Sequence, residues 1–577
     1  MALSNLDLAI IAGYLILSLF VGLWTSKQAG KNTKSFFLAN RNMPWWLLGV
    51  SMVATTFSTD TPNLVTSLVR ENGVSGNWVW WSFLLTGMMT VFIYAKLWHR
   101  SGVLTDIEFY EIRYSGKAAA FLRGFRALYL GLIFNVLVMG SVSLAAVKFG
   151  EIVLQWPGWA TLTIACSITL FYSALGGLKA IIITDFVQFI LAMIGSIWAM
   201  FYILSLPEIG GISNLLSHKN VISKISLIPE LSDPNVWVPF LAVPLTVQWW
   251  ASYYPGAEPG GGGYIAQRML SAKDESNAVG ATFLFNIAHY AIRPWPWILI
   301  ALSSLVMYPE IKDLQYEFPG LSKDKLGNDV AYPAMLTLLP SGLLGLVSAS
   351  LIAAFMSTMS TQVNLGASYL VNDFYHRFIN PSASEKHLVM IGRLFSVISI
   401  ILGGILGLIL SSAEQAFTLM LMIGSGTGLI YILRWFWWRI NAYTEIVAMV
   451  SSLMIAGYLN FGNSNLESWE KIVFGSLITT IIWITATYFT PPEKQETLKN
   501  FVKKVKPGGP GWPRKYTSPS SLIPWPVPRG ILFMALGCTA IYSILFGLGQ
   551  ALYGNNLGYV LFGISGFSIY ALKYLWD

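Results

Sequence analysis

Apolar runs of about 20 residues recur along the whole chain, and they constrain its fold more than any other feature. A run of this length is what an α-helix needs to cross the hydrocarbon core of a bilayer. Only 11% of the 577 residues are charged, whereas soluble domains carry about 25%. The sequence therefore predicts an all-α polytopic membrane protein with about 15 transmembrane helices, and the composition excludes a soluble multi-domain protein. The predicted spans are residues 6–25, 45–69, 78–98, 118–147, 158–178, 185–206, 237–265, 279–307, 333–371, 391–411, 416–438, 443–461, 471–490, 530–553 and 555–575.

The basic residues give the expected orientation. With the N-terminus outside, 25 of the 36 Lys and Arg residues lie in the loops or at the span ends of the inner side, 8 lie in those of the outer side, and 3 lie deeper within spans. Since basic residues favour the cytoplasmic side, we expect a multi-pass protein of the inner or plasma membrane with a cytoplasmic C-terminus. The net charge of +8 is then a topology signal, and a nucleic-acid partner is not expected.

Two further features concern processing and redox chemistry. The first apolar run has no basic segment before it and carries Asp7, so we expect a retained helix rather than a cleaved signal peptide. Cys166 and Cys538 both lie in apolar runs. Neither a disulfide framework nor a thiolate metal site is therefore predicted.

Two of the predicted spans are interrupted. The second contains VATTFSTDTPN, from Val53 to Asn63, and the seventh contains YYPGAEPGGGGY, from Tyr253 to Tyr264. Non-helical backbone survives at membrane depth only where it lines a cavity or is buried in protein. For one interruption alone, a simple loop or kink would be the preferred interpretation.

The two interrupted spans lie five spans apart, so each begins a unit of five helices. An odd number of helices inverts the second unit relative to the first, a pattern typical of secondary transporters whose site lies at the breaks. We therefore divide the chain into an N-terminal helix and loop, a first repeat, a second repeat, accessory helices, a Pro- and Lys-rich cytoplasmic connector and two C-terminal helices. These segments are residues 1–44, 45–236, 237–441, 442–490, 491–529 and 530–577. For the connector lysines, positive-inside anchoring is preferred over lipid binding.

One long apolar stretch, LIAAFMSTMSTQVNLGASYLVNDFY, carries the polar cluster Ser357, Thr358, Ser360 and Thr361. On a helix, Ala354, Ser357 and Thr358 share one face, and Ser357, Ser360 and Thr361 share an overlapping one. Hydroxyl and carbonyl oxygens at this spacing suit a small hard cation. The alternative is that these hydroxyls bond the preceding turn or a neighbouring helix.

Three motifs in this chain are AAFMSTMS from Ala353, YSALGGLKAIIITDFVQ from Tyr172 and YIAQRMLSAK from Tyr264. They resemble the sodium/solute symporter family, which includes sodium–sugar, sodium–proline and sodium–sialic acid carriers. The resemblance covers about the first 440 residues. It implies a leucine-transporter-type fold, with ten core helices in two inverted five-helix repeats and accessory helices at the ends.

The resemblance also implies ion ligands. The family's shared sodium site maps to Ala54, Phe57, Ala354, Ser357 and Thr358, and all five positions hold compatible residues. A second sodium site found in some members maps to Asp185, Ser357, Ser360 and Thr361. One or two coupling sodium ions are therefore expected. From the sequence alone, Asp185 could instead cap its helix, or be both cap and ligand.

The substrate site matches the family less well. In sodium–sugar members, a polar residue seven positions after the Ala54 equivalent contacts the sugar, and here it is Thr61; the position of a sugar-binding Glu holds Trp80. Around the second break the motif does not transfer, so candidates follow from location alone, with core packing as the alternative for each. These candidates are Gln248, Trp249, Trp250, Tyr253, Tyr254 and Glu258.

Arg293 lies in the middle of a predicted span, in HYAIRPWPWILIAL, near the position where sugar carriers place a Lys. A charge at membrane depth is costly and marks a pathway or an ion pair. Its guanidinium suits a substrate carboxylate, and an ion pair with Glu258 or Asp60 is the alternative. His289, one turn earlier, could bond a polyol, an anion or a backbone carbonyl.

Taken together, these features predict a sodium-coupled symporter, not an enzyme, that imports a small polar solute such as a sugar, a polyol or a small carboxylate by alternating access. Proton coupling through Asp185 and a non-transporting membrane sensor remain as alternatives. No span gathers His, Asp and Ser at catalytic spacing. We expect a small-molecule substrate and a lipid bilayer as partners, and a monomer or weak oligomer.

Overall fold

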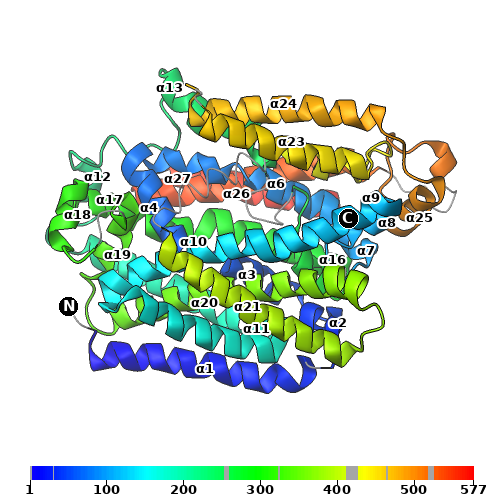
Figure 1. Cartoon of the computed structure of the whole chain (residues 1–577). Coiled ribbons are helices and arrows are strands. Elements are labelled where there is room, and N and C mark those ends of the chain that lie inside the picture. Colours follow the sequence, from blue (N-terminus) through cyan, green and yellow to red (C-terminus); the bar gives the residue numbers. More distant parts are fainter. Residues whose placement is uncertain are drawn as a thin grey trace.

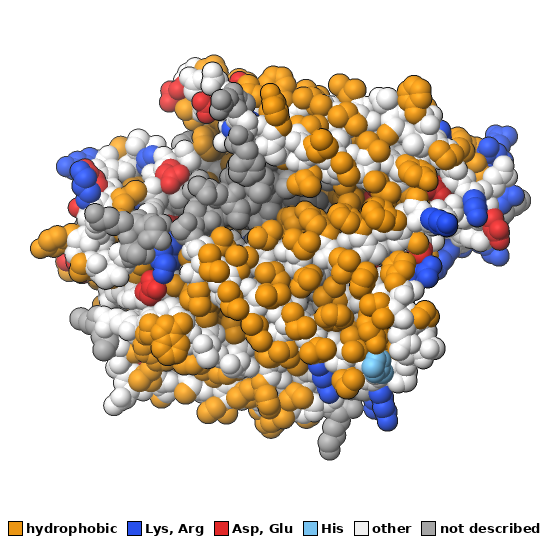
Figure 2. Space-filling view, viewed as in Figure 1, with side chains coloured by type: hydrophobic (Ala, Val, Ile, Leu, Met, Phe, Trp, Pro, Cys, Tyr) orange, Lys and Arg blue, Asp and Glu red, His pale blue; other side chains and the backbone are white. Residues whose placement is uncertain are grey.

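The computed structural model describes residues 3–29, 31–251, 259–321, 325–410, 426–462, 465–517 and 525–576. These residues form a bundle of helices, most of them running in one common direction or its reverse (Figure 1). Within the described ranges, ten helical stretches are long and apolar enough to cross a membrane. Figure 2 shows hydrophobic side chains covering the flank of the bundle, with charged side chains gathered toward its two ends.

The helices follow the chain in a simple order. Up to the second break they are α1 (Asn5–Ala29), α2 (Thr33–Leu38), α3 (Trp45–Thr55), α4 (Asp60–Asn72), α5 (Trp78–Trp81), α6 (Leu84–Met89), α7 (Ala95–Ser101), α8 (Phe109–Arg113), α9 (Gly116–Leu128), α10 (Asn135–Phe149), α11 (Gly158–Leu204), α12 (Ile212–Ser217), α13 (Pro234–Trp237) and α14 (Val243–Thr246). After it come α15 (Gly263–Ser271), α16 (Glu275–Asn286), α17 (Pro294–Met307), α18 (Ile311–Glu317), α19 (Ala331–Leu336), α20 (Leu343–Ser368), α21 (Glu385–Ile409), α23 (Ala442–Phe461), α24 (Ser468–Phe489), α25 (Gln495–Val505), α26 (Pro526–Leu552) and α27 (Leu557–Trp576). Short π-helical segments continue several of them: η3 (Thr90–Tyr94), η4 (Tyr129–Phe134), η5 (Gly150–Leu154), η6 (Val238–Ala242), η8 (Ile287–Ile292) and η11 (Tyr369–Ile379).

Both predicted breaks are present. The first separates α3 from α4, because residues 56–59 leave the helix between Thr55 and Asp60. At the second, helical segments from Pro234 end at Trp250, and α15 begins at Gly263. Tyr253, Tyr254 and Glu258 lie outside the described residues. The predicted span 416–438 is only partly described, with helix over residues 426–433.

Two predicted spans, 158–178 and 185–206, form a single bent run, α11. The bend lies at Gly177, whose backbone has φ 57° and ψ −161°, a region open only to glycine. A Cβ at this position would lie 2.7 Å from the carbonyl oxygen of Phe36. Glycine is therefore required here both for the conformation and for the close approach of the neighbouring chain.

The prediction of one continuous span over residues 333–371 is wrong at its beginning. Helix α19 ends at Leu336, and α20 begins at Leu343 after a turn containing Pro340 and Gly342 (φ 85°). The Asp7 carboxylate accepts 2.7 Å hydrogen bonds from the backbone N–H groups of Gly342 and Gly345. Asp7 thereby satisfies donors that α20 leaves open at its N-terminus.

The connector contains a helix, α25, that was not predicted from the sequence. Helix α25 buries Leu498, Phe501 and Val502 and packs against α7 and α8, while its lysines are exposed. The Arg113 guanidinium of α8 lies 5.4 Å from the Phe501 ring centroid and 5.1 Å from that of Trp512. This part of the connector is therefore folded onto the helix bundle.

Candidate functional site

The first break lies directly against α20. Thr358 of α20 donates its hydroxyl hydrogen bond to the carbonyl oxygen of Thr55 over 2.9 Å, and the same Oγ1 lies 3.4 Å from the carbonyl oxygen of Phe57. Ala54, Phe57, Ala354, Ser357 and Thr358 are all buried. Helix α20 thus presents a hydroxyl oxygen to backbone carbonyls that a continuous helix would have used for its own bonds.

The oxygens around the break form a neutral ligand set. Such hydroxyl and carbonyl oxygens suit a hard monovalent cation. The break brings together one side-chain oxygen and two backbone oxygens within hydrogen-bonding range. Of the five ligands that the motifs implied, the structure brings the Thr358 hydroxyl and the Phe57 carbonyl together, and the other carbonyl within reach is that of Thr55 rather than Ala54.

Asp185 of α11 lies behind this site, next to α3 and α20. Its two carboxylate oxygens accept hydrogen bonds from Ser357 at 2.6 Å and from Ser51 at 2.5 Å. The Arg268 guanidinium lies 3.6 Å from the same carboxylate, and both side chains are fully buried. Asp185 therefore connects three helices and is charge-balanced by Arg268.

Arg268 also occupies the surroundings of the implied second sodium site. Its guanidinium donates to Thr361 Oγ1 at 2.8 Å and to Ser51 Oγ at 3.2 Å. Ser360 donates instead to the carbonyl oxygen of Ser357, at 3.0 Å. The structure thus brings Asp185, Ser357 and Thr361 together. The positive charge among them is the Arg268 guanidinium, which contacts Asp185 and Thr361.

Sequence reasoning missed this role of Arg268, although the residue stood in the quoted YIAQRMLSAK motif. The expected span placed Arg268 just beyond its end, among the inner loop residues. In the structure it belongs to α15 and is completely buried. The available signal was a basic residue within a short helical segment next to the second break.

A small cavity of about 10 Å³ opens beside the break. This volume is about that of one water-sized sphere, so in this conformation the cavity holds no organic solute. Its wall includes Asp60 at the start of α4, Thr358 of α20 and Tyr264 of α15. The full lining is Thr55, Thr56, Ser58, Asp60, Val142, Tyr264, Thr358 and Gln362.

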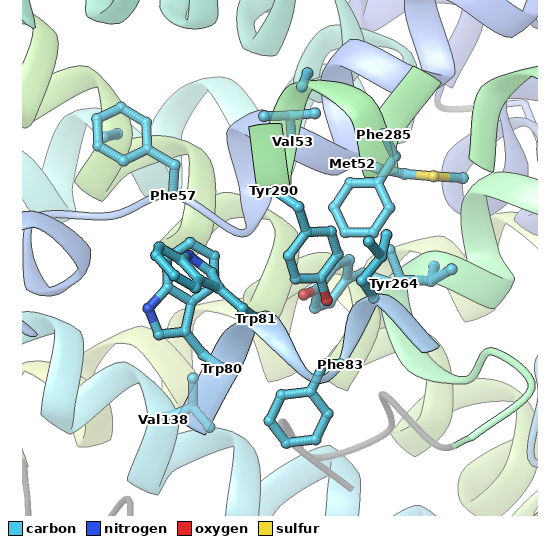
Figure 3. Close-up of a cluster of buried hydrophobic side chains, with 14 of the residues drawn as sticks. Met52, Val53, Phe57, Trp80, Trp81, Phe83, Val138, Tyr264, Phe285 and Tyr290 are labelled. Atoms are coloured by element: carbon cyan, nitrogen blue, oxygen red, sulfur yellow. The ribbon is translucent and has the colours of Figure 1, made fainter. Parts of the chain in front are cut away.

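Buried aromatic side chains from four parts of the chain form a cluster that includes Tyr264 of the cavity wall (Figure 3). Figure 3 shows Phe57 of the break, Trp80 of α5, Tyr264 of α15 and Tyr290 of η8 among them. The Trp80 and Tyr290 rings stack with centroids 5.9 Å apart, and Trp80 Nε1 donates to Asn77 over 2.8 Å. Trp80 therefore packs against Tyr290 and His289, two residues of the span that contains Arg293.

Other substrate candidates have structural partners of their own. The Gln248 amide donates to the carbonyl oxygen of Val79 at 2.7 Å, and the carbonyl oxygen of Trp249 accepts from the Thr86 hydroxyl. Thr61 Oγ1 accepts from the backbone N–H of Ser58 at 3.3 Å and donates to Asp60 at 3.4 Å. These contacts hold the ends of both breaks in place.

Arg293 and His289 are both buried in the span formed by α16, η8 and α17. The Arg293 guanidinium lies 5.5 Å from the Trp297 ring centroid and 3.4 Å from His289 Nε2. Its positive charge also acts on the Asp60 carboxylate. The Arg293 side chain therefore lies on the side of its helical span that faces the first break, to which His289 connects it.

Comparisons with known proteins agree with this geometry. The family model described as "Sodium:solute symporter family" matches residues 36–454. The sodium/glucose cotransporter of Vibrio parahaemolyticus is 26% identical over 506 residues, covering 83% of this chain and 90% of that protein. The human sodium/myo-inositol cotransporter 2 is 26% identical over 551 residues, covering 86% of this chain and 78% of that protein.

Among solved structures, a Na⁺-coupled sialic acid symporter in its substrate-bound outward-open state is similar to this chain. It superposes with a TM-score of 0.70 at 19% identity, covering 85% of this chain and 99% of that structure. A likeness at this level of identity concerns the fold, which is of the leucine-transporter type.

Proposed function

Because this chain belongs to the sodium:solute symporter family and is a sodium-coupled solute symporter of the membrane, we propose where its sodium ion binds and what it carries. The sodium site consists of the carbonyl oxygens of Ala54, Phe57 and Ala354 and the hydroxyls of Ser357 and Thr358. The observation that supports this assignment is Thr358 Oγ1, which lies 3.4 Å from the carbonyl oxygen of Phe57 and 2.9 Å from that of Thr55, the residue after Ala54.

The residues of this site prepare it for a cation. The Ser357 hydroxyl donates a hydrogen bond to Asp185. The lone pairs of its oxygen therefore remain available to a cation at the break. Asp185 thereby orients Ser357, as outer partners orient ligands in other ion sites. A sodium ion supplies one positive charge that attracts the carbonyls of the break and the hydroxyls of α20 together.

A second ion at Asp185, Ser357, Ser360 and Thr361 requires Arg268 to withdraw. Its guanidinium donates a 2.8 Å hydrogen bond to Thr361 Oγ1 and lies 3.6 Å from the Asp185 carboxylate, whose charge it balances. Two cations cannot share these oxygens without strong repulsion in a buried site. We propose that the described conformation binds one sodium ion and that a second ion binds only after Arg268 moves.

For the substrate, we propose a neutral sugar or polyol. Curated relatives are named for glucose and myo-inositol, and the Trp80 and Tyr290 rings provide apolar faces of the kind that sugar rings pack against. Arg293 and Asp60 carry opposite charges that attract each other, and we propose that they balance, so that the solute itself need carry no charge. A small carboxylate bound by Arg293 is the second candidate, favoured by the burial of this guanidinium.

We also propose that the N-terminus is outside and the C-terminus cytoplasmic, in the inner or plasma membrane, and that the transporter works as a monomer or weak oligomer. The excess of basic residues in one set of loops supports this orientation. Cysteine labelling of single-cysteine variants from each side of sealed vesicles tests it.

Uptake into proteoliposomes tests the function and the substrate class. Vesicles with an inward sodium gradient should accumulate D-glucose or myo-inositol, and a potassium gradient of the same size should not support accumulation. Sialic acid in a parallel assay tests the carboxylate alternative. Uptake that follows an inward proton gradient without sodium would favour proton coupling instead.

A further inference from the structure

A chain of buried hydrogen bonds connects Arg293 with the first break. His289 Nε2 lies 3.4 Å from the Arg293 guanidinium, and His289 Nδ1 lies 3.2 Å from Thr56 Oγ1. Thr56 Oγ1 in turn lies 3.0 Å and 2.8 Å from the carbonyl oxygens of Met52 and Val53. All three polar side chains are buried.

The chemistry of the groups sets the direction of every bond in this chain. A guanidinium only donates, so His289 Nε2 must accept and the ring proton must be on Nδ1. Nδ1–H then donates to Thr56, whose own hydroxyl proton goes to a carbonyl of the preceding helical turn. His289 is consequently held as one neutral tautomer, since a protonated ring could not accept from Arg293.

Thr56 stands between Ala54 and Phe57, whose carbonyl oxygens belong to the proposed sodium site. We propose that His289 is a positioning residue that couples the Arg293 side chain to this site: a shift of Arg293 when the solute binds reaches the break through His289 and Thr56. The inference rests on the proposed sodium site and deepens it, because it names the residue through which one site acts on the other.

A packing role is the rival explanation. The His289 ring lies 5.0 Å from Phe285, 4.4 Å from Tyr290 and 5.7 Å from Trp80, measured between ring centroids. His289→Phe keeps a ring of similar shape among these aromatics and removes both hydrogen bonds. His289→Asn places an amide near Nδ1 and keeps the Thr56 bond, whereas His289→Gln places it near Nε2 and keeps the Arg293 bond.

Sodium titration of the purified protein separates the two explanations. The readout is the sodium concentration that gives half of the maximal increase in melting temperature, with potassium replacing sodium at constant ionic strength. We expect His289→Phe to raise this concentration about 5-fold or more, a typical coupling effect, and His289→Asn to remain close to the wild type. If His289 serves only packing, His289→Phe should change the half-saturating sodium concentration little and His289→Asn should change it strongly. That result would overturn the proposal.

The Thr56 partner provides an independent check. Thr56→Val removes the hydroxyl with little change in volume, and on a His289→Phe background it should add almost nothing, because the bond is already absent. Independent, multiplying effects of the two substitutions would contradict a shared chain. A second readout uses D-glucose or myo-inositol, which should lower the half-saturating sodium concentration of the wild type but not that of His289→Phe.

The outcomes distinguish this inference from its premise. A wild-type protein that sodium does not stabilise would overturn the proposed sodium site, and the coupling role with it. A wild type that responds to sodium, together with a His289→Phe variant that responds identically, would overturn the coupling role alone.

Discussion

Ser357 of α20 donates its hydroxyl proton to Asp185 of α11 over 2.6 Å, in a fully buried environment. The bond fixes the rotation of the hydroxyl, so its oxygen lone pairs are directed away from the carboxylate. The carboxylate is in turn held by Ser51 and Arg268. An acidic residue that the motifs assigned to a second ion thus contacts Ser357, a proposed ligand of the first ion.

We therefore expect Asp185→Asn to weaken sodium binding without changing the number of ions. The amide can still accept from Ser357, but it no longer balances Arg268, and the buried guanidinium then repels the cation. Half-saturating sodium for binding to the conformation described here should rise about tenfold, equivalent to about 1.4 kcal/mol, with a Hill coefficient near one before and after. A wild-type coefficient near two that falls to one in Asp185→Asn would show that Asp185 does hold a second ion.

The proposed charge balance between Arg293 and Asp60 predicts a rescue. Arg293→Ala leaves the Asp60 carboxylate without its nearby positive charge and should destabilise the protein by about 3 kcal/mol, read as a lower melting temperature. Asp60→Asn on this background should recover most of the loss.

If Arg293 instead binds a substrate carboxylate, Asp60→Asn should not restore the melting temperature. Arg293→Lys then becomes the informative variant, because Lys cannot reproduce a forked contact with a carboxylate. It should reduce the apparent affinity for sialic acid and leave sodium binding nearly unchanged.

The bend of α11 offers a test of the fold with a matched control. Gly177→Ala introduces a Cβ 2.7 Å from the carbonyl oxygen of Phe36 at φ 57°. Gly116 also has a positive φ, of 75°, but a Cβ there meets no atom within 4 Å. Gly116→Ala should cost only the conformational strain, about 1–2 kcal/mol, so Gly177→Ala should lower the melting temperature more. Equal effects would mean that the approach of residue 36 imposes no steric requirement.

A pH dependence is expected from Asp106, in the loop before α8. Burial raises the pKa of Asp106, although hydrogen bonds from the Tyr369 hydroxyl (2.6 Å) and the Gly263 N–H (2.7 Å) lower it. Because the folded-state pKa lies above the unfolded value of about 3.9, the stability contributed by the protonated form is complete below that value and is lost as the pH rises through the folded-state pKa.

Asp106→Asn removes this titration. From pH 4 to pH 7, the wild type should therefore lose melting temperature relative to Asp106→Asn, measured in the same buffers. A difference between the two proteins that stays constant over this range would contradict the assigned direction.

The spacing of apolar residues and the positions of helix-breaking residues predicted those parts of the fold that depend on local sequence. The two breaks follow from Pro, Gly and polar residues inside apolar runs, and the face shared by Ala354, Ser357 and Thr358 follows from helical spacing. The beginning of α20 could not be predicted in this way, since its N-terminal donors are satisfied by Asp7, more than 300 residues earlier.

The site depends more on contacts between distant segments. No spacing rule brings Arg268 to Asp185, or His289 to Thr56, because each pair meets only when the two repeats pack together. Thr61, by contrast, makes only local contacts here: its hydroxyl bonds within its own turn, to Ser58 and Asp60. A motif carried over from sugar carriers does not reveal these bonds.

The sodium dependence of Thr358 variants tests the central claim most directly. Thr358→Ala removes the hydroxyl that faces the Thr55 and Phe57 carbonyls, whereas Thr358→Ser keeps it and serves as the matched control; Ser357→Ala provides a second removal on the same face. For sodium-driven uptake into proteoliposomes, with folded protein verified by gel filtration, we predict that half-saturating sodium rises about tenfold or more in Thr358→Ala and Ser357→Ala, a loss of about 1.4 kcal/mol or more, and stays near the wild-type value in Thr358→Ser. An unchanged sodium dependence in both alanine variants would contradict a sodium site between the first break and α20.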